Sequence, residues 1–192
     1  MNDEKEEKTT KKSKVKTVAV RSAKECAYLA VFVALVIGGQ LALSVVPGVE
    51  IVTVLFVAYS FVFGVRRGLL AATAFTLLRH MIFGFFPTVL VLYLIYYNGL
   101  AALFAWLGGR VKRPLRSLWW ITLVACASTA CFTLLDNVIT PLFYRYTPEA
   151  AKAYFVSSLP VMIPQVVCTA VSVGVLFFPL QKGFAAAKRG LR

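Results

Sequence analysis

The chain contains repeated apolar stretches of about 20 residues, joined by short polar or basic connections. A helix of about 20 apolar residues is what crosses the ~30 Å hydrocarbon core of a bilayer. Five of the eight acidic residues lie in the first 25 positions, and almost no charge occurs between Leu118 and Phe143. Because a water-soluble domain needs charged side chains over its whole surface, the sequence predicts an all-α integral membrane protein embedded in the lipid bilayer.

Six apolar segments define the expected membrane domain, which covers residues 26–182. Residues 1–25 are rich in Lys, Glu and Thr and predict a disordered tail, and residues 183–192 form a basic C-terminal end. Pro160 and Pro164 are expected to break the last span. The predicted spans are residues 26–46, 49–65, 69–86, 88–108, 118–142 and 155–180.

The distribution of basic residues predicts how the chain is oriented. With six spans, eighteen of the 21 Lys and Arg residues fall on the side of the two termini, whereas only Arg145 and Lys152 fall in connections on the other side. Short cytoplasmic loops carry the excess of Lys and Arg, so we expect a multi-pass plasma-membrane protein with both termini in the cytoplasm. The net charge of +13 comes with no nucleic-acid-binding motif, and we expect no nucleic-acid partner.

Several polar side chains lie inside the predicted spans, and most fall in the outer half of the membrane. Charged groups inside a span are costly and usually functional, and Arg79 suits a carboxylate or phosphate. Glu50 or Asp136 suits a cationic or N–H-rich group, and tyrosines can stack on a flat ring. The sequence therefore predicts an outward-facing substrate pocket with these candidate residues: Glu50, Arg79, His80, Tyr93, Tyr97, Asn98, Asp136, Asn137 and Gln165.

Each of these residues also has a structural interpretation. Glu50 and Arg79 could form an internal ion pair, and Asp136 with Asn137 could lie exposed at a helix end. Tyrosines in membrane helices more often belong to the core or to the interfacial belt than to a ligand site.

The first span carries small residues on one face: Ala27, Ala30, Ala34 and Gly38. Small residues allow two membrane helices to approach closely. The stripe therefore indicates either packing inside this chain or docking to a separate membrane subunit.

Sequence motifs for catalysis are missing. No Walker sequence, zinc motif or hydrolase motif occurs, and His80 is the only histidine. We therefore expect no metal, no cofactor and no ATPase or other enzymatic activity in the chain itself. The four cysteines lie in apolar segments without metal-ligand spacing and are expected to be buried free thiols: Cys26, Cys126, Cys131 and Cys168.

The stretch FVFGVRRGLLAATAFTLLRHMIFGFFP (residues 61–87), the six-span size and the alanine stripe resemble the substrate-binding (S) component of energy-coupling factor (ECF) transporters. The resemblance implies a receptor that captures a vitamin-like molecule from outside. It also implies docking through the stripe to a shared transmembrane coupling subunit with two ATPase subunits, and it favours Asp136, Asn137 and Gln165 as ligand contacts. A small membrane enzyme using Glu50 and His80, or a non-catalytic membrane scaffold, would be the alternatives.

Overall fold

The computed structural model describes residues 23–45, 51–111, 114 and 116–191, and within these ranges every regular element is an α-helix. The all-α prediction is thereby confirmed. The helices are α2 (Ala23–Leu43), α3 (Val52–Phe63), α4 (Val65–Phe83), α5 (Pro87–Arg110), α6 (Leu118–Tyr144) and α7 (Pro148–Gly190).

Four of these helices, α2, α5, α6 and α7, are long and apolar enough to cross a membrane. This finding supports a multi-pass membrane protein. The other two differ from a simple span: α3 has 12 residues, or about 18 Å of helix, and α4 carries Arg66, Arg67 and Arg79. The count of six spans therefore remains a prediction.

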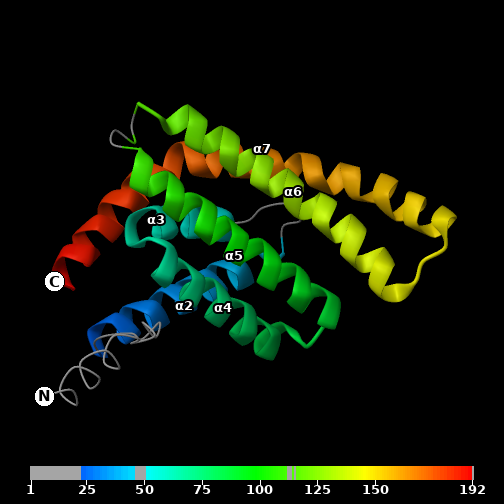
Figure 1. The fold of residues 1–192 in the computed structure, drawn as a ribbon, viewed down its shortest axis with the longest axis horizontal. Helices are drawn as coiled ribbons and strands as arrows, with labels where there is room; N and C mark the ends of the chain where they lie inside the picture. Colours follow the sequence, from blue (N-terminus) through cyan, green and yellow to red (C-terminus); the bar gives the residue numbers. More distant parts are fainter. Residues whose placement is uncertain (1–22, 46–50, 112–113, 115, 192) are drawn as a thin grey trace, which may run out of the picture.

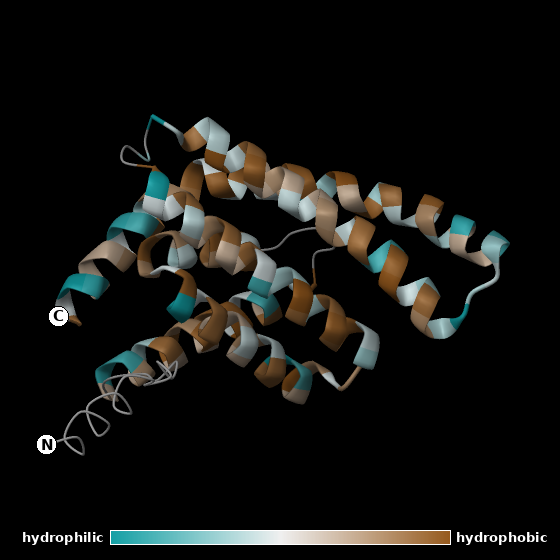
Figure 2. Ribbon diagram, in the orientation of Figure 1, coloured by the Kyte–Doolittle hydropathy of each residue, from teal (hydrophilic) through white to brown (hydrophobic). Residues whose placement is uncertain are grey.

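Consecutive helices run in opposite directions along the long axis of the molecule (Figure 1). The start of α2, the α3–α4 turn, the α5–α6 connection and the end of α7 lie at one end, which we call the basic end because it carries Arg66, Arg67, Arg110 and Arg189. The α4–α5 and α6–α7 turns lie at the opposite end, which we call the far end. In Figure 2 apolar residues cover most of the length of the helices, and polar residues gather mainly near the two ends.

A single residue, Gly64, separates α3 from α4. Its φ of +85° lies in a region that residues with a Cβ rarely adopt. The sequence suggested a turn that extends through Arg66 and Arg67, but both arginines lie in the first turn of α4. The turn is shorter than expected because one glycine is sufficient to reverse the chain.

The prediction that prolines break the last span is wrong. Helix α7 runs without interruption over 43 residues and contains Pro160, Pro164 and Pro179. Each proline removes one backbone hydrogen bond, and the bonds on either side keep the helix continuous. Figure 1 shows α7 bending as it approaches the basic end, where Pro179 provides a physical cause for a kink.

Helix α3 forms the centre of the molecule and is buried along almost its whole length. Its closest neighbours pack through small residues. A Cβ added to Gly108 of α5 would lie 2.2 Å from the carbonyl oxygen of Phe61, and one added to Gly68 of α4 would lie 3.0 Å from Ser60 Oγ and 3.3 Å from Ala101 Cβ. Close backbone approach through such residues is how membrane helices gain packing energy.

Aromatic rings close the core near the basic end. Phe184 of α7 makes edge contacts with Phe32 of α2 and Tyr59 of α3, with centroid separations of 5.7 and 5.6 Å. Arg67 forms an ion pair with Glu25, which joins α4 to α2. Lys188 donates a hydrogen bond to the carbonyl of Val62, which joins α7 to α3.

The expectation of buried thiols is not met. Cys26 and Cys131 are exposed, Cys126 and Cys168 are half-buried, and all four are free. A thiol behaves as a small apolar group, so the outer face of a lipid-facing helix accommodates it without burial in the protein.

Candidate functional site

Polar side chains line the contact between α6 and α7, although both helices are mainly apolar. Thr129 and Thr169 lie 2.9 Å apart through their hydroxyl oxygens. Nearer the far end, Asn137 Nδ2 donates to Ser158 Oγ at 2.7 Å, and the Tyr154 hydroxyl donates to Asp136 Oδ2 at 2.7 Å. Such bonds hold membrane helices together, and we call this row the polar seam.

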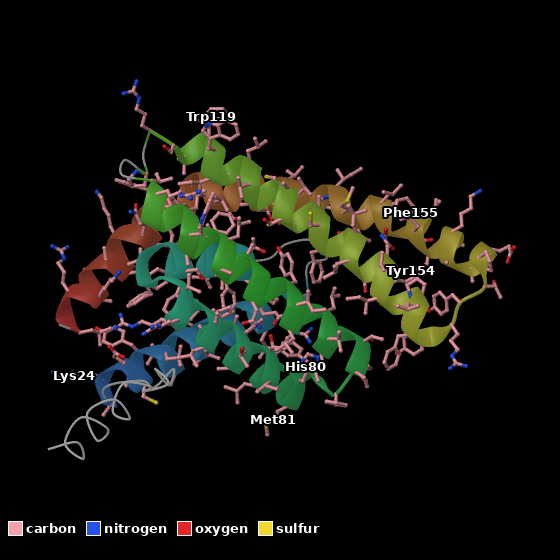
Figure 3. The ribbon with its side chains drawn as sticks, viewed as in Figure 1. Lys24, His80, Met81, Trp119, Tyr154 and Phe155 are labelled. Carbon is pink, nitrogen blue, oxygen red and sulfur yellow. The ribbon has the colours of Figure 1, made fainter. Side chains whose placement is uncertain are left out.

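A cavity of about 290 Å³ opens within the polar seam on the side of the far end. The α6–α7 hairpin surrounds this cavity, and Figure 3 shows Tyr154 of α7 near the end of the hairpin. Two of the predicted site residues, Asp136 and Gln165, line this cavity, and Asn137 lies beside it. The lining residues are Phe132, Thr133, Asp136, Tyr154, Ser157, Ser158, Val161 and Gln165.

The polar seam leaves hydrogen-bonding capacity unused next to the cavity. Thr133 Oγ1 and Asn137 Oδ1 are buried and have no hydrogen-bond partner within the described parts of the chain. Asp136 receives bonds from Tyr154 and from Thr140, both at 2.7 Å, but no basic side chain in the described ranges pairs with it. Because unsatisfied buried polar atoms cost free energy, a ligand that bonds them would gain that free energy on binding.

A second polar group lies between α4 and α5. The Arg79 guanidinium carbon lies 4.3 Å from the centroid of the Tyr93 ring and 5.1 Å from that of Phe83. His80 is only 4% exposed, and its ring meets Tyr93 edge-on at 6.2 Å. Arg79, His80 and Tyr93 therefore lie together, and none of the three lines the α6–α7 cavity.

Tyr97 and Asn98 make contacts within the helix bundle. Tyr97 is buried and packs against Phe56 and Phe75, with centroid separations of 5.0 and 5.2 Å. Asn98 Oδ1 accepts a bond from Thr73 at 3.3 Å, and Asn98 Nδ2 donates to the Leu94 carbonyl at 2.8 Å. Tyr97 thus belongs to the core, and Asn98 links α5 to α4.

Phe132 connects the two polar groups. It lines the α6–α7 cavity, and its ring packs on Tyr93 at 5.8 Å and on Tyr96 at 4.8 Å. The candidate residues therefore form two neighbouring groups joined by aromatic rings. Glu50 lies outside the described residues, and so does its suggested ion pair with Arg79.

The small-residue stripe of α2 does not pack against the rest of the described chain. All of its members are exposed: Ala27, Ala30, Ala34 and Gly38. A Cβ added to Gly38 would meet no atom within 4 Å. The helix instead buries Phe32, Val33, Val36 and Ile37, which leaves the stripe available to lipid or to another protein.

Sequence reasoning missed Tyr154 because the last span was expected to begin at Phe155, and it did not single out Ser157 and Ser158 although both lie inside that span. The missed signal is local. Thr147 Oγ1 accepts a hydrogen bond from Ala150 N at 3.3 Å, and Pro148 occupies the first helical position, a combination typical of a helix start. From that start, positions 154, 158, 161 and 165 follow helical spacing and share one face.

No known protein family, curated protein or solved structure matches the chain. The parts of the chain that the structure describes also contain no group of three or more His, Cys, Asp or Glu side chains that could hold a metal ion.

Proposed function

We propose that the chain is the substrate-binding (S) component of an ECF-type importer, which captures a vitamin-like small molecule from outside the cell. The observation that carries this proposal is the cavity in the polar seam. It combines Asp136, four hydroxyl groups and the Gln165 amide with the apolar walls Phe132 and Val161. A pocket with mainly apolar walls and a few convergent polar groups is typical of a small-molecule site.

The size of the cavity fits this proposal. At about 290 Å³, it lies near the lower end of the ~300–1,000 Å³ range of ligand pockets, which suits a molecule as small as a vitamin. Its position away from the basic end also fits. If the basic end faces the cytoplasm, as the distribution of Lys and Arg indicates, the cavity faces outside.

The closed basic end favours a subunit that captures and then releases its ligand over one that lets the ligand pass freely. The rings of Phe32, Tyr59 and Phe184 fill the core there, and Lys188 fastens α7 to the end of α3. A binding subunit with this arrangement must be opened by a partner before it can release its ligand inward.

The partner in this proposal is a transmembrane coupling subunit that carries two ATPase subunits. The chain itself has no nucleotide-binding motif, so we propose that it is not an enzyme and depends on those ATPases. The exposed stripe of Ala27, Ala30, Ala34 and Gly38 on α2 offers a surface where a partner helix can approach closely.

Thermal unfolding of the purified full-length protein in the presence of vitamins and nucleobase-like metabolites tests the proposal. A ligand at one hundred times its Kd adds about 2.7 kcal/mol to the free energy of unfolding, which is readily measured. We expect at least one compound to stabilise the wild type. Asp136→Asn should weaken that effect at least tenfold in Kd, whereas Glu149→Gln, an exposed acid outside the cavity, should not. If no compound stabilises the wild type, the proposal is wrong.

Affinity purification from native membranes separates a receptor from a scaffold. Both would recover a membrane partner, but only the importer subunit should also recover ATPases. A membrane enzyme that uses Glu50 and His80 predicts a third result, in which Glu50→Gln abolishes turnover of a substrate that still binds.

A further inference from the structure

Arg79 does not line the proposed cavity and is connected to it only through the Tyr93 and Phe132 rings. Its side chain crosses the Tyr93 ring, with the guanidinium carbon 4.3 Å from the ring centroid. Its Nε atom is buried without a hydrogen-bond partner, and no carboxylate in the described ranges forms an ion pair with it. The guanidinium is therefore held against aromatic rings by its face, while its Nε–H has no acceptor among the described residues.

His80, the next residue of α4, also has a buried nitrogen that lacks a hydrogen-bond partner in the described structure. Its Nδ1 atom lies 2.7 Å from the carbonyl of Thr76, and because a carbonyl only accepts, Nδ1 carries a proton. The residue is only 4% exposed, and its Nε2 atom is buried without a hydrogen-bond partner among the residues that the structure describes. Figure 3 shows His80 between α4 and α5, whereas its neighbour Met81 points away from the molecule.

Arg79 Nε and His80 Nε2, two buried nitrogens without hydrogen-bond partners in the described residues, cost free energy in an apolar surrounding. One anionic group could satisfy both. Arg79 Nε–H can donate to one oxygen of a carboxyl group, and the other oxygen can share a proton with His80 Nε2 in a hydrogen bond. Arginine is also the cation that best matches a planar carboxylate.

We propose that Arg79 and His80 bind the carboxylate of the transported solute. This inference rests on the proposed function and gives its substrate class. Tyr93 contacts both Arg79 and Phe132, and Phe132 lines the cavity that contains Asp136. The solute is therefore a small aromatic carboxylic acid whose ring lies along Tyr93 and Phe132 and whose opposite end presents N–H or O–H donors to Asp136.

Two other anions could neutralise Arg79. One is a lipid phosphate at the membrane surface, and the other is the Glu50 carboxylate. The inward fold of Arg79 over Tyr93 favours the solute, because a side chain that reaches for a headgroup extends away from the helix bundle. The experiment below has a separate arm for each alternative.

The first arm uses paired probes on the full-length protein in phosphate-free detergent: 4-aminobenzoate against 4-aminobenzamide, and nicotinate against nicotinamide. We expect the melting temperature to rise with a carboxylate and not with its amide. Arg79→Gln and His80→Asn should each weaken carboxylate binding at least tenfold. Arg145→Gln, an exposed arginine at the far end, is the matched control and should bind as the wild type does. Equal effects of acid and amide, unchanged binding by Arg79→Gln, or no effect of either acid would overturn the inference.

The second arm needs no ligand and compares the melting temperatures of Arg79→Gln, Glu50→Gln and the double variant. Removal of an uncompensated charge should raise the melting temperature or leave it unchanged, and the two substitutions should add. If instead each single change lowers the melting temperature and the double variant is no worse than either, Arg79 is paired with Glu50 and the inference fails.

The third arm adds phosphatidylglycerol to the detergent-solubilised protein. Stabilisation of the wild type but not of Arg79→Gln, with loss of the carboxylate effect, would assign the site to a lipid phosphate and overturn the inference. Failure of the inference about Arg79 and His80 can be told apart from failure of the proposed function. If only the inference fails, the cavity still binds a solute, and Asp136→Asn still abolishes that binding.

Discussion

Helices α3, α4 and α5 meet through small residues, whereas α6 and α7 meet through hydrogen-bonded polar side chains. In the first region Gly108 lies so close to Phe61 that no side chain fits between them. In the second, the Asp136–Tyr154 and Asn137–Ser158 bonds span the two helices and a cavity of about 290 Å³ remains. Close packing gives a rigid core, and the polar seam gives room for a ligand.

The largest effect is expected where the core is tightest. Gly108→Leu places its Cβ 2.2 Å from the Phe61 carbonyl oxygen, so α3 and α5 must separate. We expect a loss of about 3 kcal/mol or a failure to fold, measured as yield and as thermal unfolding in detergent. Gly109→Leu is the matched control, since a Cβ there meets nothing within 4 Å. Equal losses in the two variants would show that the close approach does not stabilise the core.

Loss of the Tyr154 hydroxyl should weaken the polar seam by a smaller amount. Tyr154→Phe leaves Asp136 Oδ2 without the bond of 2.7 Å, and a lost hydrogen bond to a charged group costs about 1.5–3 kcal/mol. Thermal unfolding measures this loss. The control is Tyr146→Phe, whose hydroxyl has no hydrogen bond in the described structure. If Tyr154→Phe is as stable as the wild type, the Tyr154–Asp136 bond does not stabilise the hairpin.

The exposed stripe should affect assembly and leave the fold unchanged. Ala30→Trp should leave the free energy of unfolding within about 0.5 kcal/mol and preserve ligand binding, while transport and recovery of the coupling subunit are lost. Leu35→Trp is the control, because Leu35 is also exposed and lies about 140° around the helix from Ala30. If Ala30→Trp unfolds the protein, the stripe belongs to the core.

The smallest effect is expected in the half of the polar seam that lacks the cavity. Thr129→Val removes the contact of 2.9 Å with Thr169, and hydrogen bonds between membrane helices contribute about 0.6 kcal/mol on average. Thermal unfolding of Thr129→Val, Thr169→Val and the double variant measures the coupling. A coupling above about 2 kcal/mol would mean that the polar seam holds the hairpin together as strongly as packing holds the core.

The same contrast explains how much the sequence could reveal. The lengths of the apolar runs predicted the helices, and the placement of Asp136 and Gln165 inside apolar segments marked two residues of the cavity. Arg79, His80 and Tyr93 were named as candidates from their residue types and their place in the outer half of the predicted spans, and their mutual contacts were not predicted. These inferences depend on local periodicity and on the cost of polar groups in membranes.

Other features depend on information that periodicity does not carry. The start of α7 is set by the bond between Thr147 and Ala150, so a segment defined by hydropathy alone left out Tyr154. The continuity of α7 through Pro160 depends on the hydrogen bonds of neighbouring turns. The sequence also did not reveal which face of α2 is buried, because both faces are apolar. The structure shows that the buried face is the one that carries Phe32 and Val36.

The central claim is that the cavity between α6 and α7 holds a small molecule through Asp136. Native mass spectrometry of the full-length protein, purified from its own membranes, tests this most directly. We predict a bound small molecule on the wild type and on the Glu149→Gln control, and its loss from Asp136→Asn at unchanged folding. A ligand-free wild type, or a ligand retained by Asp136→Asn, would contradict the claim.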